Sequence, residues 1–436
     1  MKHPMPPNEG SALALVLMVF TILTALFGTV LMVQVAQSRF VRRDVFRLQA
    51  RYAAEGCLAR ALVAWAEAPG ESEDTEPDCR RTSRLVGGFV RVQLEARAGP
   101  ARHRIDALVG FELPESLRDA ILHADAHGQL HLAGRTIVRG SIRAGSQGVR
   151  TGVLDGRPFS GEVDGPIHRV AVPALPAFDS RGVIAQRDRL RAWVAGDSPP
   201  EDGPDGPTRV RGETLQFGTV DSALFRSPVL LLSRDNLLLA GSLHLKSGSI
   251  LVAGGALEIS GDVRGEGVLA YAGRTIEVTG RVELAAQLVA EEGIRVAEHT
   301  RLNYPSVLLV IGQAGDLEEA GEDVPGAEIR LTGAAVVDGS VIAPKIDGEA
   351  GGRVIVEAGA TVRGLVYSAG QSEIAGQVLG TVATHRFHFY ASPTHYVNWL
   401  RDTRIDLHAR PAPFHLPLGF EGATTPEVVT IRSWGN

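Results

Sequence analysis

An uncharged stretch near the start of the chain gives the first structural prediction. Residues 11–36 carry no charged side chain, and apolar residues dominate from Ala12 to Phe20. As a helix rising about 1.5 Å per residue, such a stretch spans the roughly 30 Å of bilayer hydrocarbon. A secretory signal peptide is the alternative, but its apolar run usually covers about 7–15 residues and ends at a small-residue cleavage site. Here the run is longer and no such site follows it.

The helical pattern continues beyond the apolar stretch, and no proline interrupts it between Pro7 and Pro69. Apolar residues keep recurring at three- and four-residue steps, at Val41, Val45, Leu48, Tyr52, Leu58, Leu62 and Trp65. This spacing predicts one helix over residues 11–68, about 85 Å long, apolar all round in its first half and amphipathic in its second. The polar side of the second half is expected to carry Arg39, Arg42, Arg43, Arg47 and Arg51.

Strand patterns follow the helix. Residues 89–95 and 105–111 alternate apolar and polar positions on either side of Gly99-Pro100, which predicts a β-hairpin within a linking segment over residues 69–120. From Ile121 a different pattern begins, in which short apolar-x-apolar strands end at a glycine, as at Gly241, Gly261 and Gly280. The interval is about 18 to 20 residues.

A fixed period of this length with two-residue alternation predicts a parallel β-helix, in which short strands complete each coil and successive coils pair in parallel. Glycine is expected where φ is positive or where side chains of stacked coils would collide. We place the β-helix at residues 121–385, and its repeat is similar in pattern to bactofilin-type solenoids. A β-sandwich is the alternative. The predicted fold class is mainly β, a single long N-terminal helix followed by a parallel β-helix solenoid.

Two parts of the body break the repeat. Residues 150–227 read as an insertion on the solenoid flank, with a short helix over 182–195 and a loop rich in proline and glycine over 198–207. This insertion is either a partner-contact surface or a disordered excursion. Residues 386–436 bring in aromatic side chains and are expected to cap one end of the solenoid, with a short helical turn over 393–400, while the hairpin region before Ile121 covers the other.

The first 70 residues or so resemble type IV pilins and pseudopilins, especially the PilX-type minor pilins, whose helix commonly carries a motif close to the Ala54-Glu55-Gly56 found here. The resemblance implies a basic leader, Met1 to Gly10, that a prepilin peptidase removes by cutting between Gly10 and Ser11. Most major pilins have Phe at the first mature position and Glu at the fifth; here these positions hold Ser11 and Leu15. The family's Glu pairs with a neighbour's N-terminal amine, so a subunit without it is suited to a filament tip rather than to repetition.

The orientation of the chain is open at this stage. Five arginines follow the apolar stretch and only Lys2 precedes it, so a positive-inside count favours a cytoplasmic body and a plain single-span anchor. The pilin resemblance instead implies an inner-membrane, single-pass protein with a periplasmic or extracellular body. The two cysteines, Cys57 and Cys79, suit one disulfide in an oxidising compartment, or else two unrelated buried thiols.

The composition and the scarcity of motifs narrow the function. A net charge of −6 gives no case for nucleic-acid binding, and no glycine loop of the phosphate-binding kind is present. His385, His388 and His395 form part of a histidine-rich region that reads as polar tips within an aromatic cap rather than as a metal site. No cofactor is expected.

Carboxylates one coil apart could support glycoside hydrolysis, and the candidate pairs are Asp262 with Glu283 and Asp338 with Asp347, none of which stands out. We therefore predict a non-enzymatic structural or assembly subunit of a type IV pilus-like or secretion filament system, whose partners are the membrane, other pilin-like subunits and a prepilin peptidase. A membrane-anchored carbohydrate-binding or carbohydrate-cleaving β-helix is the alternative.

Overall fold

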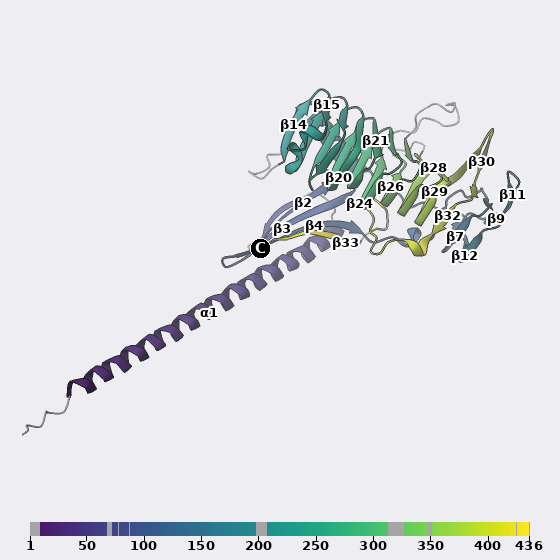
Figure 1. Ribbon diagram of the computed structural model, residues 1–436. Coiled ribbons are helices and arrows are strands. Elements are labelled where there is room, and N and C mark those ends of the chain that lie inside the picture. The colour runs from purple at the N-terminus through teal and green to yellow at the C-terminus, as the bar shows by residue number, and fades with distance from the viewer. Residues whose placement is uncertain are drawn as a thin grey trace, which may run out of the picture.

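A computed structural model describes residues 9–67, 72–76, 78–86, 88–197, 207–312, 327–346, 351–423 and 425–435. The fold class is as predicted: the chain is mainly β, with one long N-terminal apolar helix and a large parallel sheet that closes into a solenoid (Figure 1). A small antiparallel sheet lies between the helix and the solenoid. The predicted leader falls outside the described residues except for Glu9 and Gly10.

Helix α1 (Glu9–Glu67) is continuous across the change from apolar to amphipathic sequence. Its 59 residues span about 90 Å at about 1.5 Å per residue. Figure 1 shows its first part projecting away from the rest of the molecule and its last part lying against the small sheet.

The small sheet separates α1 from the solenoid. Its strands, in spatial order, are β1 (Ser72–Glu76), β2 (Cys79–Val86), β3 (Phe89–Ala98), β4 (Ala101–Phe111) and β33 (Pro426–Gly435), all antiparallel. The predicted hairpin is therefore confirmed as β3 and β4, whereas the pairing of the C-terminal β33 with β4 was not foreseen. Alternation in β3 places Val90 and Val92 in the cluster against α1, and places Phe89 in the cluster against the solenoid.

The solenoid has three stacks of parallel strands, which excludes the β-sandwich alternative. The stacks share several long strands that bend round the coil: β20 (Leu257–Ala272), β22 (Glu283–Ala290), β24 (Arg301–Val310), β26 (Val336–Ala343), β28 (Thr361–Ile374) and β29 (Gln377–Ala391). The first stack adds β14 (Thr208–Gly212), β16 (Val229–Ser233), β19 (Ile250–Ala253), β5 (Ile121–His123), β8 (Ile142–Ala144) and β13 (Ile167–Arg169).

The second and third stacks are built mostly from shorter strands. Those of the second are β15 (Leu215–Phe217), β17 (Leu237–Leu239), β21 (Thr275–Gly280), β23 (Gly293–Val296), β25 (Glu328–Leu331), β27 (Arg353–Val356), β31 (Trp399–Arg401), β6 (Leu130–Ala133) and β9 (Val149–Thr151). Those of the third are β18 (Ser242–Leu245), β32 (Arg404–Asp406), β7 (Ile137–Arg139) and β12 (Glu162–Asp164). Buried aliphatic side chains from all three stacks fill the interior.

The order of the coils in space differs from their order in the chain. β5 pairs with β29, so the coils formed by residues 121–169 lie beyond the coil of residues 377–406 and end the solenoid there. The chain then returns along the flank and starts the opposite end at β14. This corrects the expectation that the hairpin before Ile121 caps an end, because that hairpin covers the side of the solenoid instead.

The segment expected as an insertion over 150–227 contains true solenoid strands. β12 and β13 lie at one end and β14 and β15 at the other, and the short hairpin of β10 (Val153–Leu154) and β11 (Arg157–Pro158) projects between β9 and β12. Between the two ends, α2 (Arg181–Ala195) confirms the predicted short helix and packs on the first stack. Most of the predicted loop over 198–207 lies outside the described residues.

The C-terminal region carries strands where a helical turn was expected. Residues 393–400 form most of β30 (Thr394–Val397) and the start of β31, so the predicted helical turn is wrong. The overhanging end of β29 pairs with β30 as an antiparallel hairpin. Single turns of 3₁₀ helix occur at Glu115–Leu117, Thr219–Asp221, Leu224–Arg226 and Leu407–Ala409.

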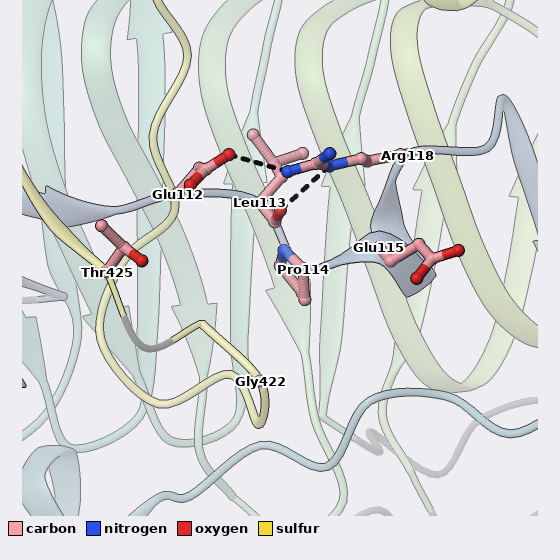
Figure 2. Close-up of a pocket in the computed structure, with 7 residues that line it drawn as sticks. All are labelled: Glu112, Leu113, Pro114, Glu115, Arg118, Gly422 and Thr425. Atoms are coloured by element: carbon pink, nitrogen blue, oxygen red, sulfur yellow. Dashed lines mark hydrogen bonds and ion pairs between the residues drawn. The ribbon is translucent and has the colours of Figure 1, made fainter.

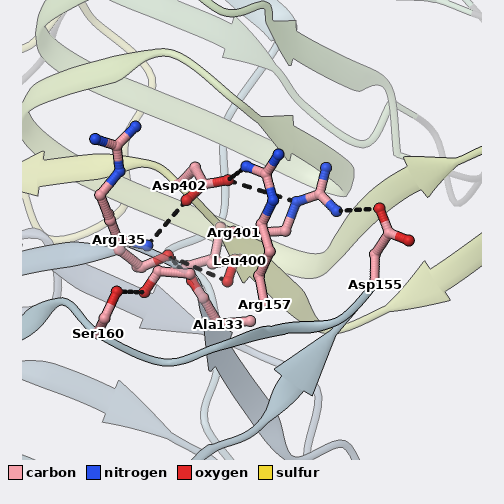
Figure 3. Close-up of polar contacts among 10 residues, drawn as sticks. Ala133, Arg135, Asp155, Arg157, Ser160, Leu400, Arg401 and Asp402 are labelled. Atoms are coloured by element: carbon pink, nitrogen blue, oxygen red, sulfur yellow. Dashed lines mark hydrogen bonds and ion pairs between the residues drawn. The ribbon is translucent and has the colours of Figure 1, made fainter.

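Polar contacts fasten the two chain regions that meet at the far end of the solenoid (Figure 3). Asp402 accepts hydrogen bonds from the Arg135 backbone N–H at 2.9 Å and from Arg157 Nη1 at 2.8 Å. Arg401 pairs with Asp155 at 3.1 Å. The first coils of the body therefore depend on residues that are synthesised more than two hundred positions later.

Stacked glycines explain one part of the repeat. Gly339, Gly364 and Gly380 are consecutive register partners with positive φ, and a Cβ on Gly380 would lie 1.9 Å from the Gly364 carbonyl oxygen. Side chains cannot be accommodated in this row, as the sequence predicted.

Candidate membrane and assembly segment

The first half of α1 has no contact with the head, by which we mean the small sheet and the solenoid together. Every described side chain from Leu13 to Val45 is exposed, including Phe20 at 70% and Met32 at 77%. These 33 residues project about 50 Å at about 1.5 Å per residue. Exposure of so many large apolar side chains marks a surface that a membrane or other protein chains cover.

Within the described residues, α1 is the one helix long and apolar enough to cross a membrane, with a mean hydropathy of 2.5 over its best window. Its hydroxyl groups are satisfied inside the helix. Thr24 Oγ1 donates to the Phe20 carbonyl at 2.6 Å, and Thr29 Oγ1 donates to the Leu26 carbonyl at 2.8 Å. Such bonds lower the cost of placing a hydroxyl in hydrocarbon, because no donor is left unpaired there.

The predicted cleavage site lies at the beginning of α1. The backbone of Gly10 and Ser11 is already helical, because α1 begins at Glu9. Leu15, at the position where the resemblance implies a glutamate, is exposed on the helix. The described part of the apolar segment therefore offers no carboxylate to a neighbouring chain.

The second half of α1 is fixed to the small sheet. Ala50, Ala54 and Ala61 recur at helical spacing with Cys57 and are buried, so the helix approaches the sheet closely. Cys57 and Cys79 are joined by a disulfide that ties α1 to the start of β2. Helix and head are thus one unit from Phe46 onward.

The five arginines of α1 are all exposed, as the sequence predicted, but they differ in their partners. Arg47 pairs with Asp44 at 3.7 Å and Arg51 with Glu55 at 2.8 Å. For Arg39, Arg42 and Arg43 no carboxylate among the described residues lies within pairing distance. Helical geometry at about 100° per residue could have separated the two groups from the sequence alone.

The histidine-rich region holds no assembled site. Tyr390 contacts His395 with the two rings tilted by 39° and their centroids 4.7 Å apart, and His388 is partly buried nearby. Burial, with Arg353 close by, lowers the pKa of His388 to about 4, so this imidazole is neutral at pH 7. Among the described residues no group of His, Cys, Asp and Glu could hold a metal ion.

The described carboxylates considered for hydrolysis each have another partner. Asp262 pairs with Arg264 at 3.2 Å, and Asp338 pairs with Arg301 at 3.2 Å. Glu283 accepts a hydrogen bond from Asn303 at 3.3 Å. Asp347 lies outside the described residues.

The hollow where the sheet meets the solenoid is lined by structural contacts (Figure 2). Its volume is about 310 Å³, and Arg118 crosses it to pair with Glu112 at 2.7 Å and to donate to the Leu113 carbonyl at 3.3 Å. No nucleophile paired with a base lines it. The exposed helix, rather than this hollow, is therefore the feature that needs a functional explanation.

No protein-family model matches the chain, and no curated protein matches it. Among solved structures, the crystal structure of the competence-associated pilin ComZ from Thermus thermophilus matches with 14% sequence identity and a TM-score of 0.21, covering 90% of this chain and 98% of that one. At that TM-score the similarity carries no argument about fold or function.

Proposed function

We propose that the chain is a non-enzymatic structural subunit of a type IV pilus-like or secretion filament system. The observation that carries this proposal is the division of α1: one unbroken helix is bare and apolar for its first half and is built into the head for its second. A plain anchor needs only the span, whereas a subunit that leaves the membrane and packs with others needs the span and the head to be one rigid piece.

The proposed role is that of a minor component. With Leu15 exposed where a glutamate would pair with a neighbour's amine, the subunit gains no charge pairing when it is placed below another copy. A position at the filament tip, or within a priming complex in the membrane, does not require that pairing.

The proposed location is the inner membrane, single-pass, with the head periplasmic or extracellular. The disulfide between Cys57 and Cys79 supports this location, because such bonds persist in oxidising compartments and are rare in the cytosol. The proposed partners are other pilin-like subunits, through the exposed half of α1, and a prepilin peptidase.

Cleavage tests the proposal directly. The full chain is expressed with a prepilin peptidase and a known pilin substrate in the same cells, and the N-terminus is sequenced. We expect a mature start at Ser11, and we expect Gly10→Val to keep Met1 because the resemblance implies that the peptidase reads a glycine before the cut. If the known substrate is cut while the wild-type chain keeps Met1, the pilin-like role is refuted and a simple anchor remains.

A further inference from the structure

The end of the small sheet nearest the projecting helix is rich in exposed arginine. Arg97, Arg102 and Arg104 flank the turn between β3 and β4, and their side chains are 60%, 58% and 69% exposed. All three pair with the same carboxylate, that of Glu95, at 3.0 to 3.6 Å. One negative charge therefore balances three positive charges at this edge.

The unpaired arginines of α1 point to the side of the helix on which the head sits. At about 100° per residue, Arg42 and Arg43 lie about 60° and 40° on either side of Arg39. On the same scale Phe46 and Cys57, which contact the head, lie within about 20° of Arg39. Arg39, Arg42 and Arg43 thus occupy the corner between the helix and the underside of the head.

The two groups of arginines lie at nearly the same height along α1. The turn between β3 and β4 rests on Phe46, since a Cβ on Gly99 would lie 3.0 Å from the Phe46 ring. Arg43 is three residues before Phe46, and Arg39 is seven before it, which is about 5 to 10 Å along the axis. This axial separation is comparable to the Debye length of about 8 Å at physiological salt, so the two groups act on the same surface.

The local charge is opposite to that of the whole chain. The chain carries a net charge of −6. At this level seven arginines, with Arg47 included, face three described carboxylates: Glu95, Asp44, which pairs with Arg47, and Asp78, whose carbonyl accepts the Arg97 backbone N–H at 3.1 Å. Seven minus three leaves four positive charges directly after a helix segment of bilayer length, the place where head groups lie when that segment spans a membrane.

We propose that this basic corner, formed by the arginines at 39, 42, 43, 97, 102 and 104, docks the head on anionic phospholipid head groups. The proposal rests on the placement of α1 in a bilayer that the proposed function includes. Arginine forms paired hydrogen bonds with phosphate oxygens, and the corner is open on the side facing the span. A subunit held in this way keeps its head in contact with the membrane surface until it is extracted into a filament.

The test measures lipid preference in the reconstituted full chain. The protein is placed in phosphatidylcholine vesicles, and the association of spin-labelled phosphatidylglycerol is compared with that of spin-labelled phosphatidylcholine by electron paramagnetic resonance. We expect the wild type to prefer the anionic lipid several-fold at low salt, and the preference to fall towards one in 0.5 M salt.

Matched variants make the test specific. Arg39→Gln, Arg42→Gln and Arg43→Gln together should abolish most of the preference, and Arg97→Gln with Arg102→Gln should reduce it. A control triple variant, Arg226→Gln, Arg281→Gln and Arg295→Gln, removes the same charge from exposed solenoid positions and should keep it. Circular dichroism melting of each variant shows whether the head has remained folded.

Several results would overturn the proposal. One is an unchanged lipid preference in the variant with Arg39, Arg42 and Arg43 all replaced by Gln, provided that its head is still folded. Another is a loss of cross-linking between copies without any loss of lipid preference, which would mean that the arginines bind a second copy. If the wild type keeps Met1 in the cleavage assay but still prefers the anionic lipid, and the helix triple variant loses that preference, the pilin-like role is refuted and the basic corner stands. A wild type that does not insert into vesicles would refute both the pilin-like role and the lipid-docking proposal.

Discussion

Breaking the bond between Cys57 and Cys79 should loosen the second half of α1 from the small sheet. The bond closes a segment with a sequence separation of 22 residues. In the chain-entropy description, closing a loop of that length stabilises the folded state by about 3 kcal/mol at 25 °C. Both cysteines are buried between α1 and the sheet, so the constraint acts at the joint that makes helix and head one unit.

The assay is urea unfolding of the full chain in detergent micelles, combined with amide hydrogen exchange of residues 46–64. We expect Cys57→Ala to lower the free energy of unfolding by about 3 kcal/mol and to raise exchange over these residues first. Cys57→Ala, Cys79→Ala and the double variant should cost nearly the same, because one bond is lost once in each case. Adding dithiothreitol should weaken only the wild type.

The reasoning fails if dithiothreitol leaves the wild type unchanged, or if the double variant costs the sum of the two single variants. Either result would mean that the two sulfurs contribute as separate buried side chains. In that case rigidity between helix and head would have to come from the alanine-lined packing alone.

Three further outcomes follow from the solenoid. Gly380→Ala should lower the free energy of unfolding in urea by about 2–5 kcal/mol, because its φ is +154° and its Cβ would lie 1.9 Å from the Gly364 carbonyl oxygen. The control, Gly156→Ala, has a φ of +71° and open space around it, so it should cost only its backbone strain. Equal losses would contradict the stacking explanation. Asn398→Ala should raise hydrogen exchange in β5 and β8 and leave β14 unchanged. The reason is that Asn398 Nδ2 donates to Asp125 at 3.0 Å and Asn398 Oδ1 lies 2.9 Å from His123 Nε2, where the C-terminal coil meets the coil that begins with β5. A uniform loss of protection would contradict a local effect. The free energy of unfolding should fall as the pH drops from about 6.5 towards 4. The pKa of His388 is lowered to about 4 in the folded state, so the unfolded chain binds more protons in this pH range. His388→Gln should flatten that part of the stability–pH curve, and an unchanged slope would exclude His388 as its cause.

The sequence predicted the elements whose information is local. The apolar helical segment, its continuation to the end of α1 and the hairpin of β3 and β4 each follow from a pattern within about twenty residues, and all three are present. The glycine-marked period predicted coils for the same reason. A repeat of this kind specifies what one coil looks like, and every coil presents the same edge of backbone donors and acceptors to the next.

The order of the coils could not be predicted for that same reason. β5 pairs with β29 on one side and with β8 on the other, but the repeat in the sequence gives no reason for β29 to be its neighbour. That choice depends on contacts between distant parts of the chain, such as that of Arg157 with Asp402. The missed β33 has the same origin, since its partner β4 is separated from it by the whole solenoid. The helical turn expected over 393–400 failed because a hairpin beyond the last long strand overrode local propensity.

The arginines after the span bear on the orientation that the sequence left open. A positive-inside count treats all five alike, yet the structure divides them into two with carboxylate partners, Arg47 and Arg51, and three in the corner beneath the head. The positive-inside rule counts Lys and Arg and gives carboxylates little weight, so pairing does not remove Arg47 and Arg51 from the count. The remaining three lie where a lipid-docking function accounts for them, on whichever side of the membrane the head resides. The count of arginines and the disulfide therefore favour opposite sides of the membrane: the count favours a cytoplasmic head, and the disulfide favours an oxidising compartment.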